Sequence, residues 1–215
     1  MEHIYLFSGL GADHRVFMGL DFSGYEVTHI KWIPNQKNES LEHYASRLVE
    51  QMKSDEPTLI GLSFGGIIAV EIAKLIKTKR VILLASVKTF KELPKVYRIF
   101  APLNLHRLLP NWLLVRSNFI VNWLFGTESK PDRILLSEIL RDTDPVFLKW
   151  ALGKISNWKN IDVHGNLKHI HGTADRIFPF KFVKCDFPID GGGHFMTVNK
   201  TAELSKIIRQ ILTVK

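Results

Sequence analysis

Ser63 stands out because its type and surroundings suggest chemistry. It lies in Gly61-Leu62-Ser63-Phe64-Gly65-Gly66, between the apolar run Thr58–Leu62 and the almost wholly apolar run 64–76. We therefore expect a buried strand, a tight turn and a helix, a context that exposes the serine hydroxyl at the end of the strand. A serine hydroxyl is a poor nucleophile at its ordinary pKa, so nucleophilic chemistry here needs a base. The alternative is a turn serine beside a glycine-rich packing contact.

His194 is the best candidate for that base among the nine histidines. It follows three glycines (191–193), which we expect to form a flexible loop that brings the imidazole over a distant serine. Asp175 is the best candidate for the acid that orients the imidazole, because it lies in a turn after the predicted strand 167–171. A turn aspartate that binds its own backbone is the alternative for this residue. The substitutes for the acid are Asp144, Asp162 and Asp186.

The motifs Gly-x-Ser-x-Gly-Gly, His-Gly-Thr-x-Asp-x-x-x-Pro and Gly-Gly-His-Phe follow one another in this order. Together they resemble the α/β-hydrolase superfamily over nearly the whole chain. The resemblance implies Ser63 as nucleophile, His194 as general base and Asp175 as the residue that orients it. It also implies an oxyanion hole formed by the backbone N–H groups of Leu10 and Phe64. This chemistry requires no metal and no organic cofactor.

The chain departs from the family pattern at three points. Ser8 stands where many relatives have histidine, so the glycine-rich loop 8–13 is anchored differently. We expect no counterpart of the family's first two strands before the strand 4–7. Between Asp175 and His194, the usual helix is reduced to a few residues around 180–184.

Alternating apolar runs and helical patterns predict an α/β fold, a three-layer sandwich with a mostly parallel sheet and helices on both faces. The expected strands are 4–7, 25–30, 58–62, 80–85, 167–171 and 182–189, and the expected helices are 41–52, 64–76 and 201–212. Ser40 is the expected N-cap of the first helix. Between 87 and 160 the alternation stops. We interpret 1–215 as one domain with 87–160 as a helical cap insertion.

The predicted cap is rich in aromatic residues and in positive charge. Its candidate substrate-lining residues are Phe100, Leu103, Trp112, Phe119 and Trp123. The net charge of the chain is +8, and residues 88–159 contain twelve Lys or Arg against six Asp or Glu. This excess can attract an anionic substrate, although a solvated surface is the simpler interpretation. No nucleic-acid motif accompanies the charge, so we expect no nucleic-acid partner.

Other features of the sequence bear on location and metal binding. The apolar region 99–125 is interrupted by arginines, prolines and asparagines, so it predicts no membrane span. The amino-terminal residues do not have the pattern of a secretory signal, and Cys185 is the single cysteine, so we expect a cytoplasmic protein. A zinc site is a minor hypothesis, with His164, His169 and His171 as candidate ligands.

The resemblance and the residues together favour a serine hydrolase that cleaves a carboxylic ester or thioester through an acyl-enzyme. The serine excludes the dehalogenases and epoxide hydrolases, which have aspartate at this position. Two alternatives stay open. One is another reaction on the same triad, such as carbon–carbon bond hydrolysis, lactone hydrolysis or a cofactor-free lyase reaction. The other is a ligand-binding protein without catalysis.

Overall fold

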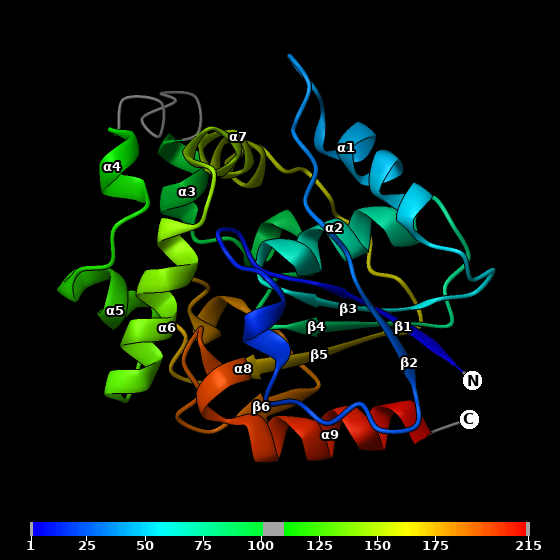
Figure 1. The fold of residues 1–215 in the computed structure, drawn as a ribbon. Helices are drawn as coiled ribbons and strands as arrows, with labels where there is room; N and C mark the ends of the chain where they lie inside the picture. Colours follow the sequence, from blue (N-terminus) through cyan, green and yellow to red (C-terminus); the bar gives the residue numbers. More distant parts are fainter. Residues whose placement is uncertain (1, 101–109, 214–215) are drawn as a thin grey trace.

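The fold is built on a six-stranded, all-parallel β-sheet (Figure 1). The computed structural model describes residues 2–100 and 110–213. The strands occur in the spatial order β2-β1-β3-β4-β5-β6. They are β1 (His3–Phe7), β2 (Glu26–His29), β3 (Thr58–Leu62), β4 (Arg80–Leu84), β5 (Leu167–Gly172) and β6 (Phe187–Ile189). The α/β fold class predicted from the sequence is therefore confirmed.

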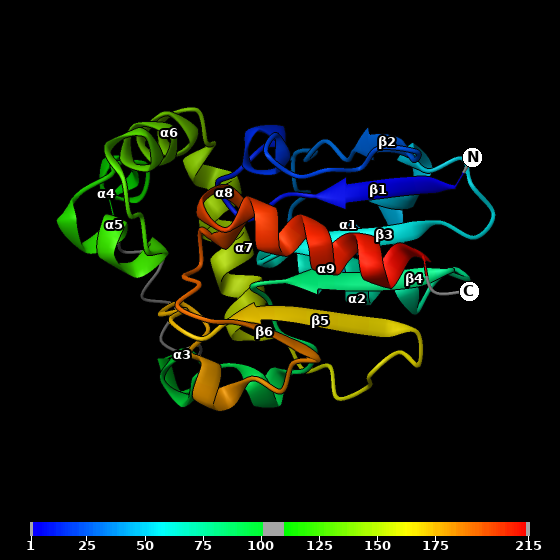
Figure 2. The same cartoon turned by 90° about the horizontal axis from the view of Figure 1, so that it is seen from below.

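Both faces of the sheet are buried, because side chains alternate between the two faces along each strand. In β1, Tyr5 and Phe7 belong to one hydrophobic core, and Ile4 and Leu6 belong to the other. The helices α1 (Leu41–Leu48) and α2 (Phe64–Ala73) cover the first face. The helix α9 (Thr201–Thr213) covers the second face, and Figures 1 and 2 show the resulting three layers.

The element boundaries differ modestly from those predicted. Ser40 caps α1 as expected, with its hydroxyl accepting from the His43 N–H, but the helix ends at Leu48 and a 3-10 turn (Val49–Gln51) follows. The strand predicted over 182–189 forms only at 187–189. This strand is at the edge of the sheet and contains Pro188, which has no N–H to donate and is tolerated there. A 3-10 turn (Phe180–Phe182) stands where the reduced helix was expected.

Between β4 and β5 the described residues contain no strand, and their helices gather beyond the carboxyl ends of the strands (Figures 1 and 2). We call these helices the helical segment. They are α3 (Lys95–Phe100), α4 (Asn111–Leu114), α5 (Phe119–Phe125), α6 (Lys130–Arg141) and α7 (Pro145–Ser156). No helix among the described residues is long and apolar enough to cross a membrane.

A buried polar contact joins the end of the helical segment to the body of the fold. The Trp158 indole N–H donates to Oε1 of Glu71 at 2.7 Å, and the Lys74 ammonium pairs with the other carboxylate oxygen. Glu71 lies on α2 and is 1% exposed, so both of its oxygens need partners within the protein. The contact therefore fixes the chain that leaves α7 against α2.

We expect Trp158→Phe to lower the free energy of unfolding by about 1 to 3 kcal/mol, because one oxygen of the Glu71 carboxylate then lies buried without a donor. Urea unfolding followed by circular dichroism measures this. Trp123→Phe is the matched control, since that side chain is 51% exposed and its replacement should cost less than about 0.5 kcal/mol. Equal effects of the two substitutions would contradict the role of the Glu71 contact.

Candidate active site

Ser63 lies where the topology of the sheet opens a crevice. From β1 the chain moves to β2 on one side, whereas from β3 it moves to β4 on the other side. Connections that diverge in this way leave a crevice at the carboxyl ends of the two central strands, where ligands bind in open α/β sheets. Ser63 is the residue between β3 and α2, and it therefore stands at this crevice.

The backbone of Ser63 is left-handed, with φ 52° and ψ −118°. A non-glycine residue adopts this region only when its surroundings hold it there. The Ser63 N–H donates to the Leu84 carbonyl at 2.9 Å, and the Ser86 hydroxyl donates to the Ser63 carbonyl at 2.6 Å. Ser86 was not predicted from the sequence. Both anchors lie at or just after the end of β4, so the strand next to β3 holds the strained turn.

The glycines around Ser63 are required by close packing of the backbone. A Cβ at Gly65 would lie 2.2 Å from the Phe7 carbonyl oxygen, and one at Gly61 would lie 2.4 Å from the Gly65 carbonyl oxygen. These distances are impossible for a side chain, so α2 approaches β1 and β3 only with glycine at both positions. The turn is as tight as the Gly-x-Ser-x-Gly spacing predicted.

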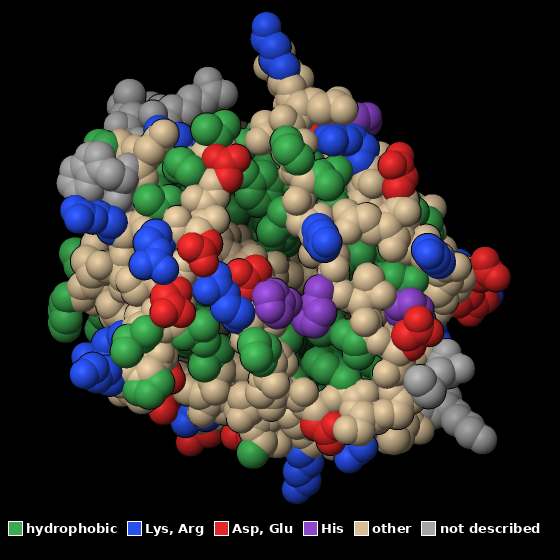
Figure 3. All heavy atoms as spheres, viewed as in Figure 1, with side chains coloured by type: hydrophobic (Ala, Val, Ile, Leu, Met, Phe, Trp, Pro, Cys, Tyr) green, Lys and Arg blue, Asp and Glu red, His purple; other side chains and the backbone are tan. Residues whose placement is uncertain are grey.

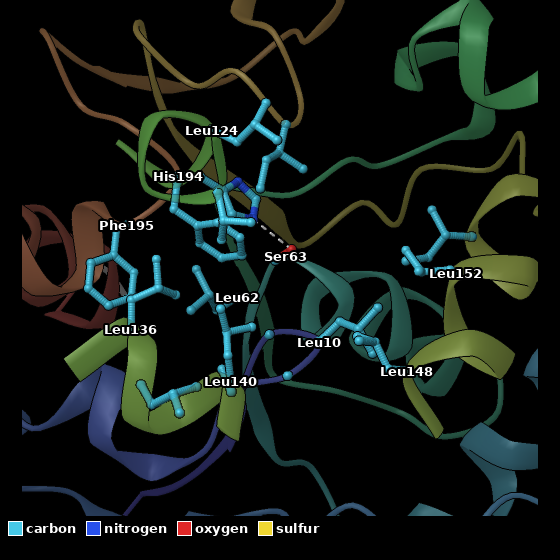
Figure 4. Close-up of a pocket in the computed structure, with 18 of the residues that line it drawn as sticks. Leu10, Leu62, Ser63, Leu124, Leu136, Leu140, Leu148, Leu152, His194 and Phe195 are labelled. Atoms are coloured by element: carbon cyan, nitrogen blue, oxygen red, sulfur yellow. Dashed lines mark hydrogen bonds between the residues drawn. The ribbon is translucent and has the colours of Figure 1, made fainter. Parts of the chain in front are cut away.

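His194 lies within hydrogen-bonding distance of Ser63, on the loop between β6 and α8 (Met196–Asn199). Its Nε2 is 2.8 Å from Ser63 Oγ (Figure 4). Its Nδ1 is 2.8 Å from Asp175 Oδ2. A carboxylate only accepts, so Nδ1 carries the proton and Nε2 is free to accept from the serine hydroxyl. The rings of Phe125 and Phe178 both meet the imidazole edge-on at 5.6 Å and fix its plane.

The loop before His194 is close-packed, and its glycines do more than give the flexibility that we expected. A Cβ at Gly172 would lie 2.1 Å from the Gly192 carbonyl oxygen, and one at Gly193 would lie 3.1 Å from Cα of Gly126 in the helical segment. Gly191 has φ +63°, which favours glycine. The glycine run thus lets the loop pass between β5 and the end of α5.

Asp175 is both a turn residue and the partner of the imidazole. Its Oδ1 accepts from the N–H groups of Ile177 and Phe178 at 2.8 and 2.9 Å, and its Oδ2 accepts from His194. Burial raises the pKa of this carboxyl, but the charge and hydrogen bond of His194, the charge of His171 and the Phe178 N–H outweigh burial. The net pKa is lowered, so Asp175 is ionised despite its 4% exposure.

The three substitute aspartates lie in other structural roles. Asp144 accepts from the Val146 N–H as the N-cap of α7, and Asp186 accepts from the His169 N–H. Asp162 interacts through its backbone with the Asn160 side chain. None of the three is hydrogen-bonded to His194 among the described residues.

His171 supports the turn that carries Asp175. Its Nε2 donates to the Phe178 carbonyl at 2.8 Å and lies 3.7 Å from Asp175 Oδ2. Burial lowers the pKa of His171, although the Asp175 charge acts in the opposite direction. His169 packs against it with ring centroids 5.2 Å apart, and His164 binds Asn166. The described residues contain no group of three or more His, Cys, Asp or Glu side chains placed to hold a metal.

The glycine-rich loop 8–13 lies against Ser63, where a Cβ at Gly9 would be 3.4 Å from Ser63 Cβ. The Ser8 hydroxyl donates to the Ala12 carbonyl at 2.7 Å and closes the loop on itself, which explains how serine serves as the anchor here. Among the hydrogen bonds of the described residues, none uses the N–H of Leu10 or of Phe64. Both donors are therefore available to a bound group.

An apolar cavity of about 360 Å³ opens beside Ser63 and His194 (Figure 4). The figure shows leucines of α6 and α7 on opposite sides of the serine. The described residues that line the cavity include no charged side chain. Those from the helical segment are Tyr97, Leu114, Val121, Leu124, Phe125, Leu136, Ile139, Leu140, Leu148, Leu152, Ile155 and Ser156.

The lining differs from the one predicted. Phe119 and Trp123 are 83% and 51% exposed and do not line the cavity, because they lie on the outer face of α5. Val121, Leu124 and Phe125 form the inner face of the same helix. Leu103 and the side chains of Phe100 and Trp112 lie outside the described residues.

We expect Asp175→Asn to lower the free energy of unfolding by about 1.5 to 3 kcal/mol at pH 7, since the folded state favours the charged carboxylate. The Asp175 pKa is lowered in the folded state, so this stabilisation is present above the ordinary pKa of 3.8 and is lost as pH falls through the folded value. Urea unfolding of both proteins between pH 7 and 3 tests this. A difference that does not shrink on acidification would contradict the lowered pKa.

Comparisons with known proteins agree with this architecture. The model of the Alpha/beta hydrolase family matches residues 3–206. No curated protein sequence matches the chain. Among solved structures, an esterase from Thermogutta terrifontis has a TM-score of 0.74 and 16% identity, with 99% of this chain and 89% of that chain covered.

Two other solved structures are similar over most of their length. An esterase from Exiguobacterium antarcticum has a TM-score of 0.73 and 15% identity, with 99% and 92% of the two chains covered. A lipase-esterase related protein from Clostridium acetobutylicum has a TM-score of 0.71 and 19% identity, with 98% and 94% covered. The family model extends over nearly the whole chain, and the parallel sheet with its helical layers agrees with it. The chain belongs to the alpha/beta hydrolase family.

Proposed function

We propose that the protein hydrolyses carboxylic esters or thioesters of apolar acyl groups through an acyl-enzyme on Ser63. The observation that carries this proposal is the continuous hydrogen-bonded series Ser63–His194–Asp175, with two contacts of 2.8 Å, at the wall of an apolar cavity. A hydroxyl bonded to a neutral imidazole, whose other nitrogen donates to an ionised carboxylate, is the arrangement that activates serine.

In the first step, Ser63 Oγ attacks the carbonyl carbon while its proton passes to His194 Nε2. The carbonyl oxygen gains negative charge, and the free N–H groups of Leu10 and Phe64 are placed to donate to it. One such donor lowers the barrier by about 3 kcal/mol. Collapse of the tetrahedral intermediate breaks the bond to the leaving alcohol or thiol, which takes the proton from His194 and leaves the acyl group on Ser63.

In the second step, His194 removes a proton from water, and the hydroxyl attacks the acyl carbon. The acid leaves after the proton returns to Ser63 Oγ. Throughout both steps Asp175 holds Nδ1–H of the imidazole and stabilises the positive charge that develops on the ring. The two backbone N–H groups that fix Oδ1 of Asp175 prevent the carboxylate from rotating away from His194.

The cavity determines the class of acyl group in this proposal. Its described lining is made mostly of leucine, isoleucine, valine and phenylalanine, so a charged acyl group would lose its hydration without gaining a partner of opposite charge. An uncharged hydrocarbon chain gains the burial energy instead. We propose that the helical segment acts as a cap that supplies this wall.

The proposal predicts that Ser63→Ala abolishes the hydrolysis of p-nitrophenyl esters and acyl thioesters, by at least about a thousandfold in kcat. A fluorophosphonate probe should label the unsubstituted protein once and leave Ser63→Ala unlabelled, as intact-mass measurement would show. Ser46→Ala is the control, because Ser46 is an exposed serine on α1 whose hydroxyl binds a helix carbonyl. A protein that neither turns over these substrates nor reacts with the probe would refute the assignment.

The cavity also predicts how chain length is selected. Leu148 lies on the inner face of α7, and we expect Leu148→Trp to shorten the cavity there. The ratio of kcat/KM for octanoyl esters over that for acetyl esters should then fall by about tenfold or more, because several methylene groups of the octanoyl chain can no longer be buried. Val146→Trp is the matched control, because Val146 is 62% exposed on the same helix. An unchanged ratio in Leu148→Trp would place the acyl chain elsewhere.

A further inference from the structure

A second depression lies on the other side of the loop 8–13, away from the apolar cavity. We call it the outer groove. It has a volume of about 290 Å³ and lies at the carboxyl ends of β1 and β2. Its polar lining consists of Ser8, Asp13, His14, His29, Lys31 and Trp32. Ala12 lines both the groove and the cavity, so only the loop separates them.

The outer groove gathers three basic side chains that form no hydrogen bond with the described residues. The rings of His14 and His29 meet edge-on at 5.9 Å. Figure 3 shows histidine side chains gathered in the middle of the face that it views. Neither imidazole is hydrogen-bonded to a described residue, and the nearest carboxylate oxygen to His14, on Asp13, is 3.9 Å away. Burial lowers the pKa of His29, and the charge of the neighbouring His14 lowers it further. Each ring therefore has an N–H that no described residue accepts.

Lys31 adds a third basic group, and hydrogen bonds with the Gln51 side chain hold its backbone in position. The Gln51 side chain accepts from the Lys31 N–H at 3.0 Å and donates to the Lys31 carbonyl at 2.9 Å. No ion pair within the described part of the chain involves the Lys31 ammonium. The carboxylate in the groove, Asp13, pairs with Arg15 at 2.7 Å, and Arg15 also pairs with Asp142 at 2.7 Å, so the charge of Asp13 is partly compensated.

Trp32 connects the groove with the residues around Ser63. It lines the groove, and its ring lies 5.4 Å from the ring of Phe64, whose N–H is one of the two free donors beside Ser63. Its own indole N–H is buried and has no hydrogen-bond partner among the described residues. Two imidazoles and an ammonium that form no hydrogen bond with the described residues are suited to an acceptor with negative charge.

We propose that the outer groove binds an anionic group, a carboxylate or a phosphate, between Lys31 and the imidazoles of His14 and His29. The group belongs either to a free small anion or to the leaving group of the substrate, and in the second case the proposal rests on the proposed hydrolysis at Ser63. The two compartments then divide the binding: the cavity takes an uncharged acyl chain, and the groove takes negative charge.

The direct test is a titration of the whole protein with inorganic phosphate and, separately, with succinate, followed by the imidazole C–H resonances in NMR spectra. His14→Gln and His29→Gln assign the two resonances. We expect both to shift in a saturable way, with an affinity that falls roughly threefold to tenfold in Lys31→Ala. Lys53→Ala is the matched control, because it removes the same charge at a distant place. Lys53 is exposed and precedes β3, at the opposite end of the sheet.

A kinetic test separates the two sources of the anion. The ratio of kcat/KM for a carboxylated nitrophenyl ester over its neutral counterpart is compared in the unsubstituted protein, Lys31→Ala and Lys53→Ala. A ratio that falls only in Lys31→Ala assigns the groove to the leaving group, and a constant ratio with phosphate or succinate binding assigns it to a free anion. No saturable shift and no change in the ratio would overturn the groove site. Saturable shifts in a protein that hydrolyses nothing would retain the groove and refute the proposed function alone.

Discussion

The strained backbone of Ser63 is the constraint on which the arrangement of this site depends. A non-glycine residue with φ near +52° costs on the order of 1 to 3 kcal/mol, and the fold must supply that energy elsewhere. It does so next to the turn, because every residue of α2 is buried. Complete burial of one Ile or Val side chain contributes about 1.5 to 3 kcal/mol, and Ile67, Ile68 and Ile72 are all fully buried. The helix that follows the turn is sufficient to hold it.

The orientation of Asp175 follows a similar logic, in which one group satisfies two requirements. A turn after β5 needs an acceptor for the N–H groups of Ile177 and Phe178, and a neutral asparagine would provide one. The second oxygen faces an imidazole in a buried setting, where a negative charge stabilises the imidazolium. The turn and the imidazole together keep the pKa of the carboxyl low despite burial. Asp175 therefore accepts hydrogen bonds both from its own turn and from the imidazole of His194.

The parts that the sequence predicts well are those encoded by short-range pattern. The strands β1, β3, β4 and β5 appear as apolar runs, because both of their faces are buried, and the turn at Ser63 follows from glycines at fixed spacing. The residues that line the cavity could not be predicted from such a short-range pattern. In α5 the outer residues Phe119 and Trp123 are as apolar as the inner residues Leu124 and Phe125, so no polar face reveals which side points inward.

Other features depend on contacts between distant parts of the chain, and a single sequence does not show them. The Ser86 hydroxyl reaches the Ser63 carbonyl only because β4 lies beside β3. Tight packing of the loop before His194 against Gly126 likewise depends on where α5 ends. In both cases nothing in the neighbouring sequence marks the residue, because its role depends on a contact with a residue that is distant in the chain.

The loop 8–13 shows how small residues allow two different environments to lie close together. One side of it lines the apolar cavity next to Ser63, and its other side lines the basic groove. Gly9, Gly11 and Ala12 make this wall little more than one backbone thick, and Gly11 has φ +70°, which a larger residue would resist. The Ser8–Ala12 hydrogen bond closes the loop from within, so its stiffness does not depend on a bulky side chain that would fill either compartment. The apolar cavity and the charged groove can therefore lie side by side with only this loop between them.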